Sequence, residues 1–248
     1  MTDRPTGRGL KAQRKQTMGE EIANTITHGL GAVLSLGCFG VAVAFAAIRG
    51  DAWRIVSASI YGFMMFLMYL SSTMYHAAVW RKSKEILNII DHSAIYLMIA
   101  GSYTPFCLVA LRQHSPPWGW SIFGAIWGLA IIGIVFQVFT MQRINAVTAS
   151  NPNAPLPVFV QRIRVLSTLT YVLMGWVCVI AVYPLWQAMG AMGVGGIAVG
   201  GLLYTFGVAF YVLKHLKYMH AVWHLFVLGG SMVHFFTILF YVMLPAAQ

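Results

Sequence analysis

Long stretches without an acidic or basic residue divide the chain. Six of them contain no Asp, Glu, Lys or Arg: residues 22–48, 55–80, 92–111, 113–142, 165–213 and 218–248. A helix needs about 20 apolar residues to cross the hydrocarbon core of a bilayer, so five stretches predict one transmembrane helix each. The stretch 165–213 is long enough for two helices and is interrupted by the sequence YPLWQAMGAMG. The pattern therefore predicts seven transmembrane helices, at residues 23–48, 54–79, 89–111, 117–140, 165–186, 191–212 and 219–244.

Composition supports this interpretation. Of the 248 residues, 59% are hydrophobic and 9% are charged, whereas soluble domains carry about 25% charged residues. The first apolar run is too long for a cleaved signal peptide, so we expect it to be retained. The predicted fold is all-α, a seven-helix transmembrane bundle over residues 19–248 that follows a basic cytoplasmic tail over residues 1–18.

The distribution of basic residues predicts the orientation. The chain has 16 Lys and Arg against 6 Asp and Glu. If the N-terminus is inside, thirteen basic residues fall on the inner side: Arg4, Arg8, Lys11, Arg14, Lys15, Arg81, Lys82, Lys84, Arg143, Arg162, Arg164, Lys214 and Lys217. Only Arg49, Arg54 and Arg112 fall outside. This asymmetry predicts a cytoplasmic N-terminus and an extracytoplasmic C-terminus.

The same distribution indicates which partners to expect. Basic residues beside membrane spans attract anionic lipid headgroups, so we expect membrane lipids as partners and no nucleic acid. The expected location is the plasma membrane, and the oligomeric state stays open. Gly196 and Gly200 form a small-xxx-small pair that allows close helix approach, and packing within one bundle is favoured over a dimer seam. Pro105 predicts a kink in the third span. Residues 141–164 are expected to form a flexible cytoplasmic loop.

Polar side chains gather at one predicted membrane level, on the cytoplasmic side. They open the first, third and seventh spans and end the second: Glu21, Asn24, His28, Asp91, His220, His224, Ser72 and His76. Polar groups at membrane depth cost free energy, so such a gathering indicates function.

The spacing of the histidines indicates a metal site. Residues four apart on a helix have Cβ atoms about 5–6 Å from each other, so His220 and His224 present two imidazoles to one point. With His76 they would give a three-histidine zinc site whose fourth position is open to water, as in catalytic sites. Asp91 could then orient or deprotonate that water, and Ser72 could hydrogen-bond to it or to a developing oxyanion.

Each of these residues also has a simpler interpretation. Histidines at a headgroup boundary can face water, and imidazole binds several divalent metals besides zinc. His28 and Asn24 fit a supporting or packing role better than a ligand role. Glu21 either supports the site or complements the dipole of the first helix.

The complete pattern resembles a known family. Glu21-x₂-Asn24-x₃-His28, Ser72-x₃-His76, Asp91 and His220-x₃-His224 stand in the order seen in the hemolysin III family, the bacterial branch of the progesterone and adipoQ receptor superfamily. That superfamily includes the adiponectin receptors. The resemblance implies a zinc ion held by His76, His220 and His224, with Asp91 contacting the zinc-bound water. Because the superfamily also includes alkaline ceramidases, it further implies a zinc-dependent hydrolase of lipid amides.

Two functions follow from these observations. One is an intramembrane zinc hydrolase that acts on a lipid amide or ester near the cytoplasmic leaflet. The other is a non-catalytic hemolysin III-type membrane protein, with a structural zinc ion, that serves membrane homeostasis or lyses a target membrane. Whether the protein is an enzyme stays open at this stage.

Overall fold

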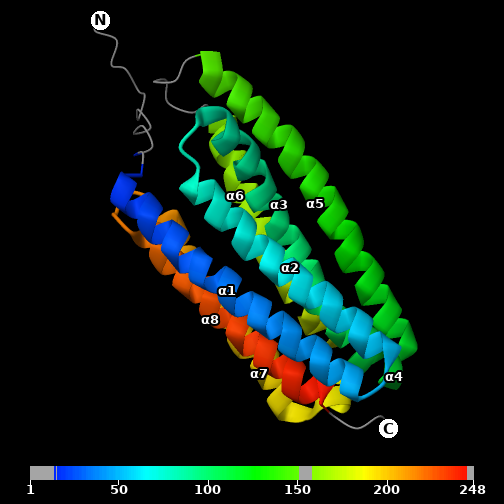
Figure 1. The fold of residues 1–248 in the computed structure, drawn as a ribbon. Helices are drawn as coiled ribbons and strands as arrows, with labels where there is room; N and C mark the ends of the chain where they lie inside the picture. Colours follow the sequence, from blue (N-terminus) through cyan, green and yellow to red (C-terminus); the bar gives the residue numbers. More distant parts are fainter. Residues whose placement is uncertain (1–13, 15, 151–157, 245–248) are drawn as a thin grey trace, which may run out of the picture.

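The computed structural model describes residues 14, 16–150 and 158–244 and is helical throughout, with no strand in these ranges. Short π-helical (η1, η3) and 3₁₀ (η2) segments continue some of the α-helices (Figure 1). In chain order the elements are α1 (Met18–Ile48), α2 (Ala52–Ala77), α3 (Arg81–Pro105), η1 (Phe106–Leu111), α4 (Arg112–His114), α5 (Pro116–Ser150), α6 (Val158–Gly175), η2 (Trp176–Ala181), α7 (Val182–Val212), α8 (Met219–Ile238) and η3 (Leu239–Met243).

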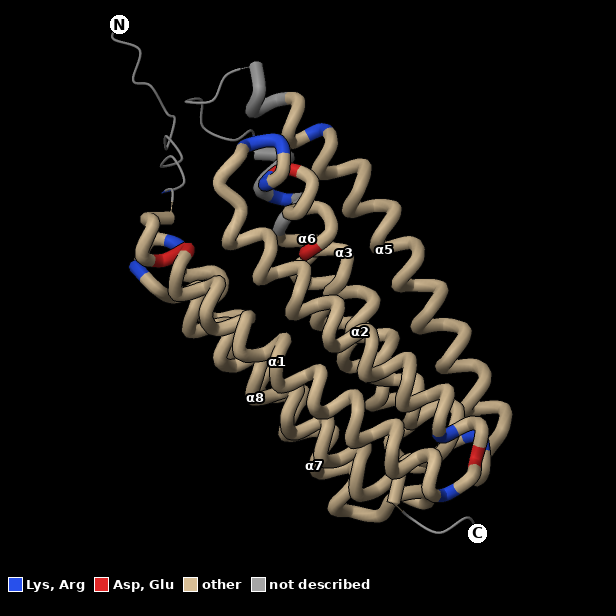
Figure 2. Tube along the Cα trace, in the orientation of Figure 1, with Lys and Arg blue, Asp and Glu red and all other residues tan. Residues whose placement is uncertain are grey.

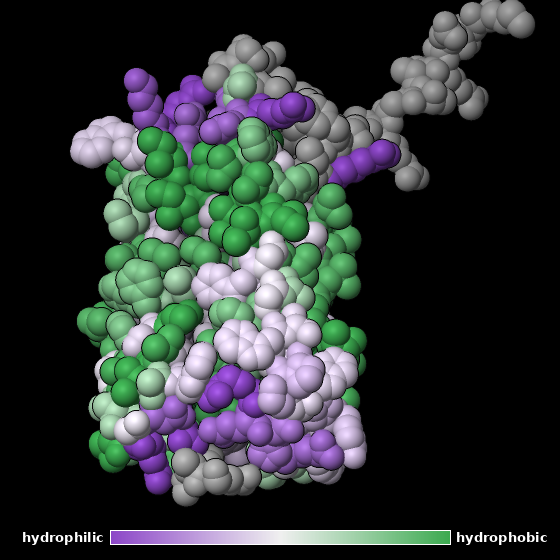
Figure 3. Space-filling view, turned by 90° about the vertical axis from the view of Figure 1, so that its right-hand side faces the viewer, coloured by the Kyte–Doolittle hydropathy of each residue, from purple (hydrophilic) through white to green (hydrophobic). Residues whose placement is uncertain are grey.

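Six helical segments of the described chain are long and apolar enough to cross a membrane. They are Met18–Ile48, Ala52–Ala77, Arg81–His114, Pro116–Ala146, Val165–Val212 and Met219–Met243. Hydrophobic side chains form a broad belt between more hydrophilic ends (Figure 3). Most charged residues lie toward the two ends of the bundle (Figure 2). The chain is therefore built as a multi-pass membrane protein.

The segment Val165–Val212 is where the span count differs from expectation. It has 48 residues, and at 1.5 Å per residue a straight helix of that length would measure about 72 Å, more than twice the hydrocarbon thickness of about 30 Å. The helix is interrupted at Gly190, whose φ of 70° and ψ of −178° are not helical. Glycine adopts positive φ without steric cost. The division of this segment into two spans stays a prediction.

The largest departures from the predicted span ends are in α3 and α5. α3 begins at Arg81 and not at residue 89, and α5 continues to Ser150 instead of ending at 140. In both cases polar residues extend the helix beyond the apolar run, because no proline or glycine stands there to end it. The expected loop over 141–164 is accordingly helical up to Ser150 and again from Val158, and its proline-rich part, 151–157, lies outside the described residues.

Small residues bring α7 and α8 close together. A Cβ atom at Gly196 would lie 2.2 Å from Thr237 Oγ1, and one at Gly200 would lie 2.2 Å from His234 Cδ2. Both glycines therefore pack against α8 of the same chain, as expected for packing within the bundle. At Pro105 the α-helix gives way to π-helix η1, because proline has no N–H to donate to the ladder.

The polar residues singled out from the sequence lie mostly where three helices meet, namely α1, α2 and α8. α1 packs against α2 along its length and also against α8, while α7 packs against α8. These helices run side by side in Figure 1. Residues near the start of α1 therefore face both the last turn of α2 and the first turn of α8.

Candidate metal centre

Three imidazoles meet between the end of α2 and the start of α8. Ligand atoms of His76, His220 and His224 lie within 4.8 Å of one another. The ring centroids are 5.0 Å apart for His76 and His220, 5.2 Å for His76 and His224, and 4.6 Å for His220 and His224. Zinc binds imidazole nitrogen at about 2.0–2.1 Å, so small side-chain rotations would let the three residues share one ion.

The ring of His76 is held by α1. Its Nδ1 lies 2.7 Å from Glu21 Oε2 and 3.3 Å from Asn24 Nδ2. Glu21 in turn accepts a hydrogen bond of 2.6 Å from Lys84 Nζ. The other ring nitrogen, Nε2, is buried and has no hydrogen-bond partner among the described residues.

The ring of His224 is held in the same way. Its Nδ1 lies 3.0 Å from Thr27 Oγ1, and that hydroxyl also donates to Ala23 O at 2.9 Å. A hydroxyl that donates its proton to the backbone can accept a hydrogen bond from His224 Nδ1. His224 Nε2 is buried without a partner in the described part of the chain. His28 stacks on this ring.

This arrangement of donors fits a bound metal ion. A metal-binding histidine usually donates one ring N–H to a carboxylate or other oxygen, which directs the lone pair of the second nitrogen to the ion. His76 and His224 both follow that pattern, with Glu21 and Thr27 as the oxygen partners. Two buried Nε2 atoms without partners would be costly unless something binds them. The three-histidine cluster can hold a metal ion.

Asp91 and Ser72 approach from α3 and α2. Asp91 is buried, and the buried side chain of Ser72 lies near it. Asp91, His76 and His220 line one cavity of about 190 Å³. Asp91 does not belong to the group of three ligands whose atoms converge. It therefore lines the cavity beside the three histidines and is not a fourth close ligand.

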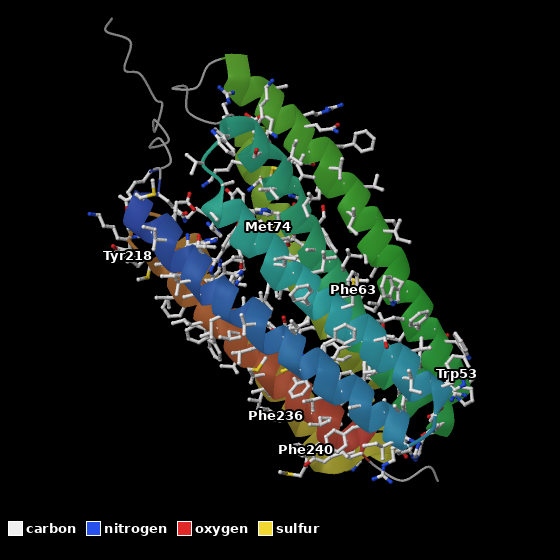
Figure 4. The ribbon with its side chains drawn as sticks, viewed as in Figure 1. Trp53, Phe63, Met74, Tyr218, Phe236 and Phe240 are labelled. Atoms are coloured by element: carbon white, nitrogen blue, oxygen red, sulfur yellow. The ribbon has the colours of Figure 1, made fainter. Side chains whose placement is uncertain are left out.

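A second polar cluster fixes the start of α8. Arg14 donates two hydrogen bonds of 2.6 Å to Glu20 and one of 3.2 Å to Leu216 O. Glu20 also accepts from the backbone N–H of Tyr218 at 3.0 Å and from Thr17 N at 2.9 Å. Tyr218 has a φ of 63°, the left-handed region, and stands two residues before a candidate ligand. It lies at the end of the bundle where α1 begins (Figure 4).

The structure places most of the residues singled out from the sequence around the three histidines, and other residues join them. Glu21 and Asn24 contact His76, and His28 contacts His224. Sequence reasoning missed a set of supporting residues: Arg14, Gln16, Glu20, Thr27 and Lys84. Thr27 could have been found because it lies three residues after Asn24 and so shares its helix face. Gln16, which accepts from Asn24 Nδ2 at 3.0 Å, precedes the helix and carries no periodic signal.

Comparison with known proteins gives full-length matches. The family described as "Haemolysin-III related" matches residues 16–235. The chain is 45% identical over 225 residues to the "Hemolysin-3 homolog" of Bacillus subtilis (strain 168), covering 91% of this chain and 95% of that protein. It is 43% identical over 233 residues to the "Hemolysin-3" of Bacillus cereus, covering 94% and 96%. It is also 27% identical over 233 residues to the human "Monocyte to macrophage differentiation factor", covering 90% and 85%.

Proposed function

The chain belongs to the haemolysin-III-related family, and from that premise we propose that it is a zinc-dependent hydrolase of lipid amides or esters in the plasma membrane. The observation that carries the proposal is the paired anchoring of His76 and His224. Each has its Nδ1 held by an oxygen of α1 and its Nε2 buried without a partner among the described residues.

Three ligands, not four, favour a catalytic over a structural site. Structural zinc sites are closed by four protein ligands, whereas catalytic sites have three and keep one position open. The described residues supply three converging ligands: His76, His220 and His224. When bound there, zinc would supply a water nucleophile at neutral pH and polarise a carbonyl oxygen.

Two cavities beside the histidines suit an amphipathic substrate. The cavity of about 190 Å³ has polar lining residues such as Asn88 and Gln137. A second cavity of about 150 Å³ is lined mainly by apolar side chains, among them Met68, Met98 and Val227. Four residues line both cavities: Asp91, Ile95, Tyr171 and Trp223. A lipid with its head in one cavity and its chain in the other would place the junction between them at Asp91.

The residues at that junction can carry out a hydrolysis. Asp91 would accept a proton from the attacking water and return it to the leaving amine or alcohol, as a general base and then a general acid. Ser72, which lies near it, would donate a hydrogen bond and so hold the carboxylate in one orientation. The apolar cavity would exclude bulk water from the acyl chain.

The orientation we propose has the N-terminus in the cytoplasm and seven spans. α1 begins at the end of the bundle opposite to the end of η3 (Figure 1), and an odd number of crossings is consistent with this. The proposed seventh span comes from dividing Val165–Val212 at Gly190. The positive-inside rule then puts the metal centre near the cytoplasmic leaflet.

Metal content is the first test. Mass spectrometry of the purified protein should find about one zinc ion per chain, and fewer in His76→Ala and in His220→Ala/His224→Ala. Zinc-loaded wild type should hydrolyse a member of a panel of N-acyl and O-acyl lipids, while Asp91→Asn should keep its zinc and lose hydrolysis. Wild type without stoichiometric metal would refute the proposal. If the wild type contains zinc but hydrolyses none of the lipids, and if the His→Ala variants unfold, the results would favour a non-catalytic membrane protein with a structural zinc ion.

A further inference from the structure

The polar cavity has a wall that the proposed chemistry does not use. Its hydrogen-bonding side chains come from α3, α5 and α6, whereas the histidines come from α2 and α8. They are Asn88, Gln137, Thr140, Ser167 and Thr168. Polar residues on membrane-spanning helices usually line a functional cavity, so this wall indicates a second recognition element.

Gln137 is the residue of this wall whose side-chain nitrogen has no hydrogen-bond partner in the described part of the chain. Its side chain is 1% exposed, and its Nε2 has no hydrogen-bond partner among the described residues. Its Oε1 accepts from Ser167 Oγ at 3.4 Å, a long contact. A buried amide donor left without an acceptor costs free energy. A ligand in the cavity that offers an oxygen acceptor would remove that cost.

The charges around the cavity select an uncharged ligand group. Arg14 lines the cavity, but both of its terminal nitrogens are bound to Glu20 at 2.6 Å. Lys214 also lines it, but this residue is exposed and its ammonium lies 4.6 Å from the centroid of the Tyr211 ring. A hydroxyl or carbonyl oxygen on an uncharged head group fits these surroundings.

We propose that Gln137 determines head-group specificity, by donating a hydrogen bond to a hydroxyl or carbonyl oxygen on the uncharged head of the lipid substrate. This inference rests on the proposed function for the position of the lipid, whose chain would lie in the apolar cavity. Gln137 acts on the part of the molecule that is not cleaved, so it contributes to binding and not to the hydrolytic step.

Binding of two matched ureas tests the proposal without turnover. Ureas resist hydrolysis, and N-dodecyl-N′-(2-hydroxyethyl)urea differs from N-dodecyl-N′-propylurea only by a hydroxyl in place of a methyl group. Dissociation constants would be measured by calorimetry on the full-length protein in lipid nanodiscs. We expect wild type to bind the hydroxyl compound about fivefold more tightly, which is the effect of one neutral hydrogen bond.

Gln137→Leu should reduce this preference to about one while it keeps the affinity for the propyl compound. Gln137→Met keeps the length of the side chain but removes the hydrogen-bond donor, and it should lose the preference as Gln137→Leu does. It replaces the leucine variant if that variant does not fold. Gln187→Leu is the control, because Gln187 is exposed and donates to Tyr183 OH at 3.0 Å on another part of the bundle.

Three results would overturn the proposal. One is an unchanged preference in both Gln137 variants, and another is a wild type that binds neither urea. In the third, the wild type binds a compound with a phosphate in place of the hydroxyl more tightly than the hydroxyl compound, and Gln137→Leu loses that preference. This result would mean that the recognised head group is anionic. If the protein shows no zinc-dependent hydrolysis but still prefers the hydroxyl compound in a way that depends on Gln137, only the proposed enzymatic function is refuted.

Discussion

The imidazole of His28 stacks on that of His224, with ring centroids 3.4 Å apart and 20° between the ring planes. His28 is buried, and neither of its nitrogens has a hydrogen-bond partner within the described ranges. Its edge-on neighbour is Tyr69, with ring centroids 5.1 Å apart. His28 therefore contacts the candidate ligand through its ring face.

Replacement of His28 should test this contact. We expect His28→Ala to weaken zinc binding about tenfold, the lower end of the effect seen when support for a metal ligand is lost, because the His224 ring gains freedom to rotate. His28→Phe keeps an aromatic face and should stay within about threefold of wild type on the same scale. Competition with a chromophoric chelator measures both values. Equal losses in the two variants would contradict the stacking role.

Loss of the Glu21 charge should also weaken metal binding. Glu21 joins His76 Nδ1 at 2.7 Å to Lys84 Nζ at 2.6 Å. Glu21→Gln can no longer accept a charge-assisted hydrogen bond from the imidazole, and about a 10- to 100-fold loss of zinc affinity is expected. Glu85→Gln is the matched control, since Glu85 pairs with Arg81 on the same helix surface at 2.8 Å. If both variants bind zinc like wild type, His76 does not depend on this carboxylate.

Glu20 should matter for stability. Its side chain is 3% exposed and accepts hydrogen bonds from Arg14, Thr17 and Tyr218. Glu20→Gln would leave part of this set unpaired, and we expect a loss of about 1–3 kcal/mol in the free energy of unfolding. The partly exposed Arg14 contributes little of this, because solvent screens its charge. Denaturant unfolding in detergent, on metal-free protein, measures the change. A change below that of Glu85→Gln would contradict the prediction.

The close approach of α7 and α8 predicts a contrast between neighbouring glycines. A Cβ at Gly200 would lie 2.2 Å from the His234 ring, whereas one at Gly195 would have no atom within 4 Å. Gly200→Ala should therefore lower the free energy of unfolding by about 1–3 kcal/mol through overpacking. Gly195→Ala should be neutral or slightly stabilising, because alanine favours the helix. The measurement is the thermal unfolding midpoint of each single variant. Equal midpoints would contradict the close packing of Gly200 against His234.

The cluster of candidate ligands could be predicted from the sequence because their spacing is a helical property. His220 and His224 share a face at four-residue spacing, and the charge-free runs put His76 at the same membrane level. The direction of each ring could not be predicted. It depends on α1, which meets the ends of α2 and α8 only in the folded bundle. The helix face of Thr27 could be inferred from its spacing, but its contact with His224 could not.

The fold could be predicted from the sequence to a similar extent. Charge-free runs locate the helices because a bilayer excludes charge, and they fail where a helix leaves the membrane. α5 extends to Ser150 for this reason. Gln137 stands inside a run that reads as uniformly apolar, and only the packing of α3, α5 and α6 shows that it faces a cavity. A single polar residue carries no sign of the direction in which it points.

The positions of His76 and His220 in the chain also bear on how the protein is made. Chains emerge from the ribosome N-terminus first, so α1 and α2 can pair early and hold His76 against Glu21. The metal centre stays incomplete until α8, the last long helix, has entered the membrane. A bound ion would thus be acquired at the end of biogenesis and would lock the first and last helices together.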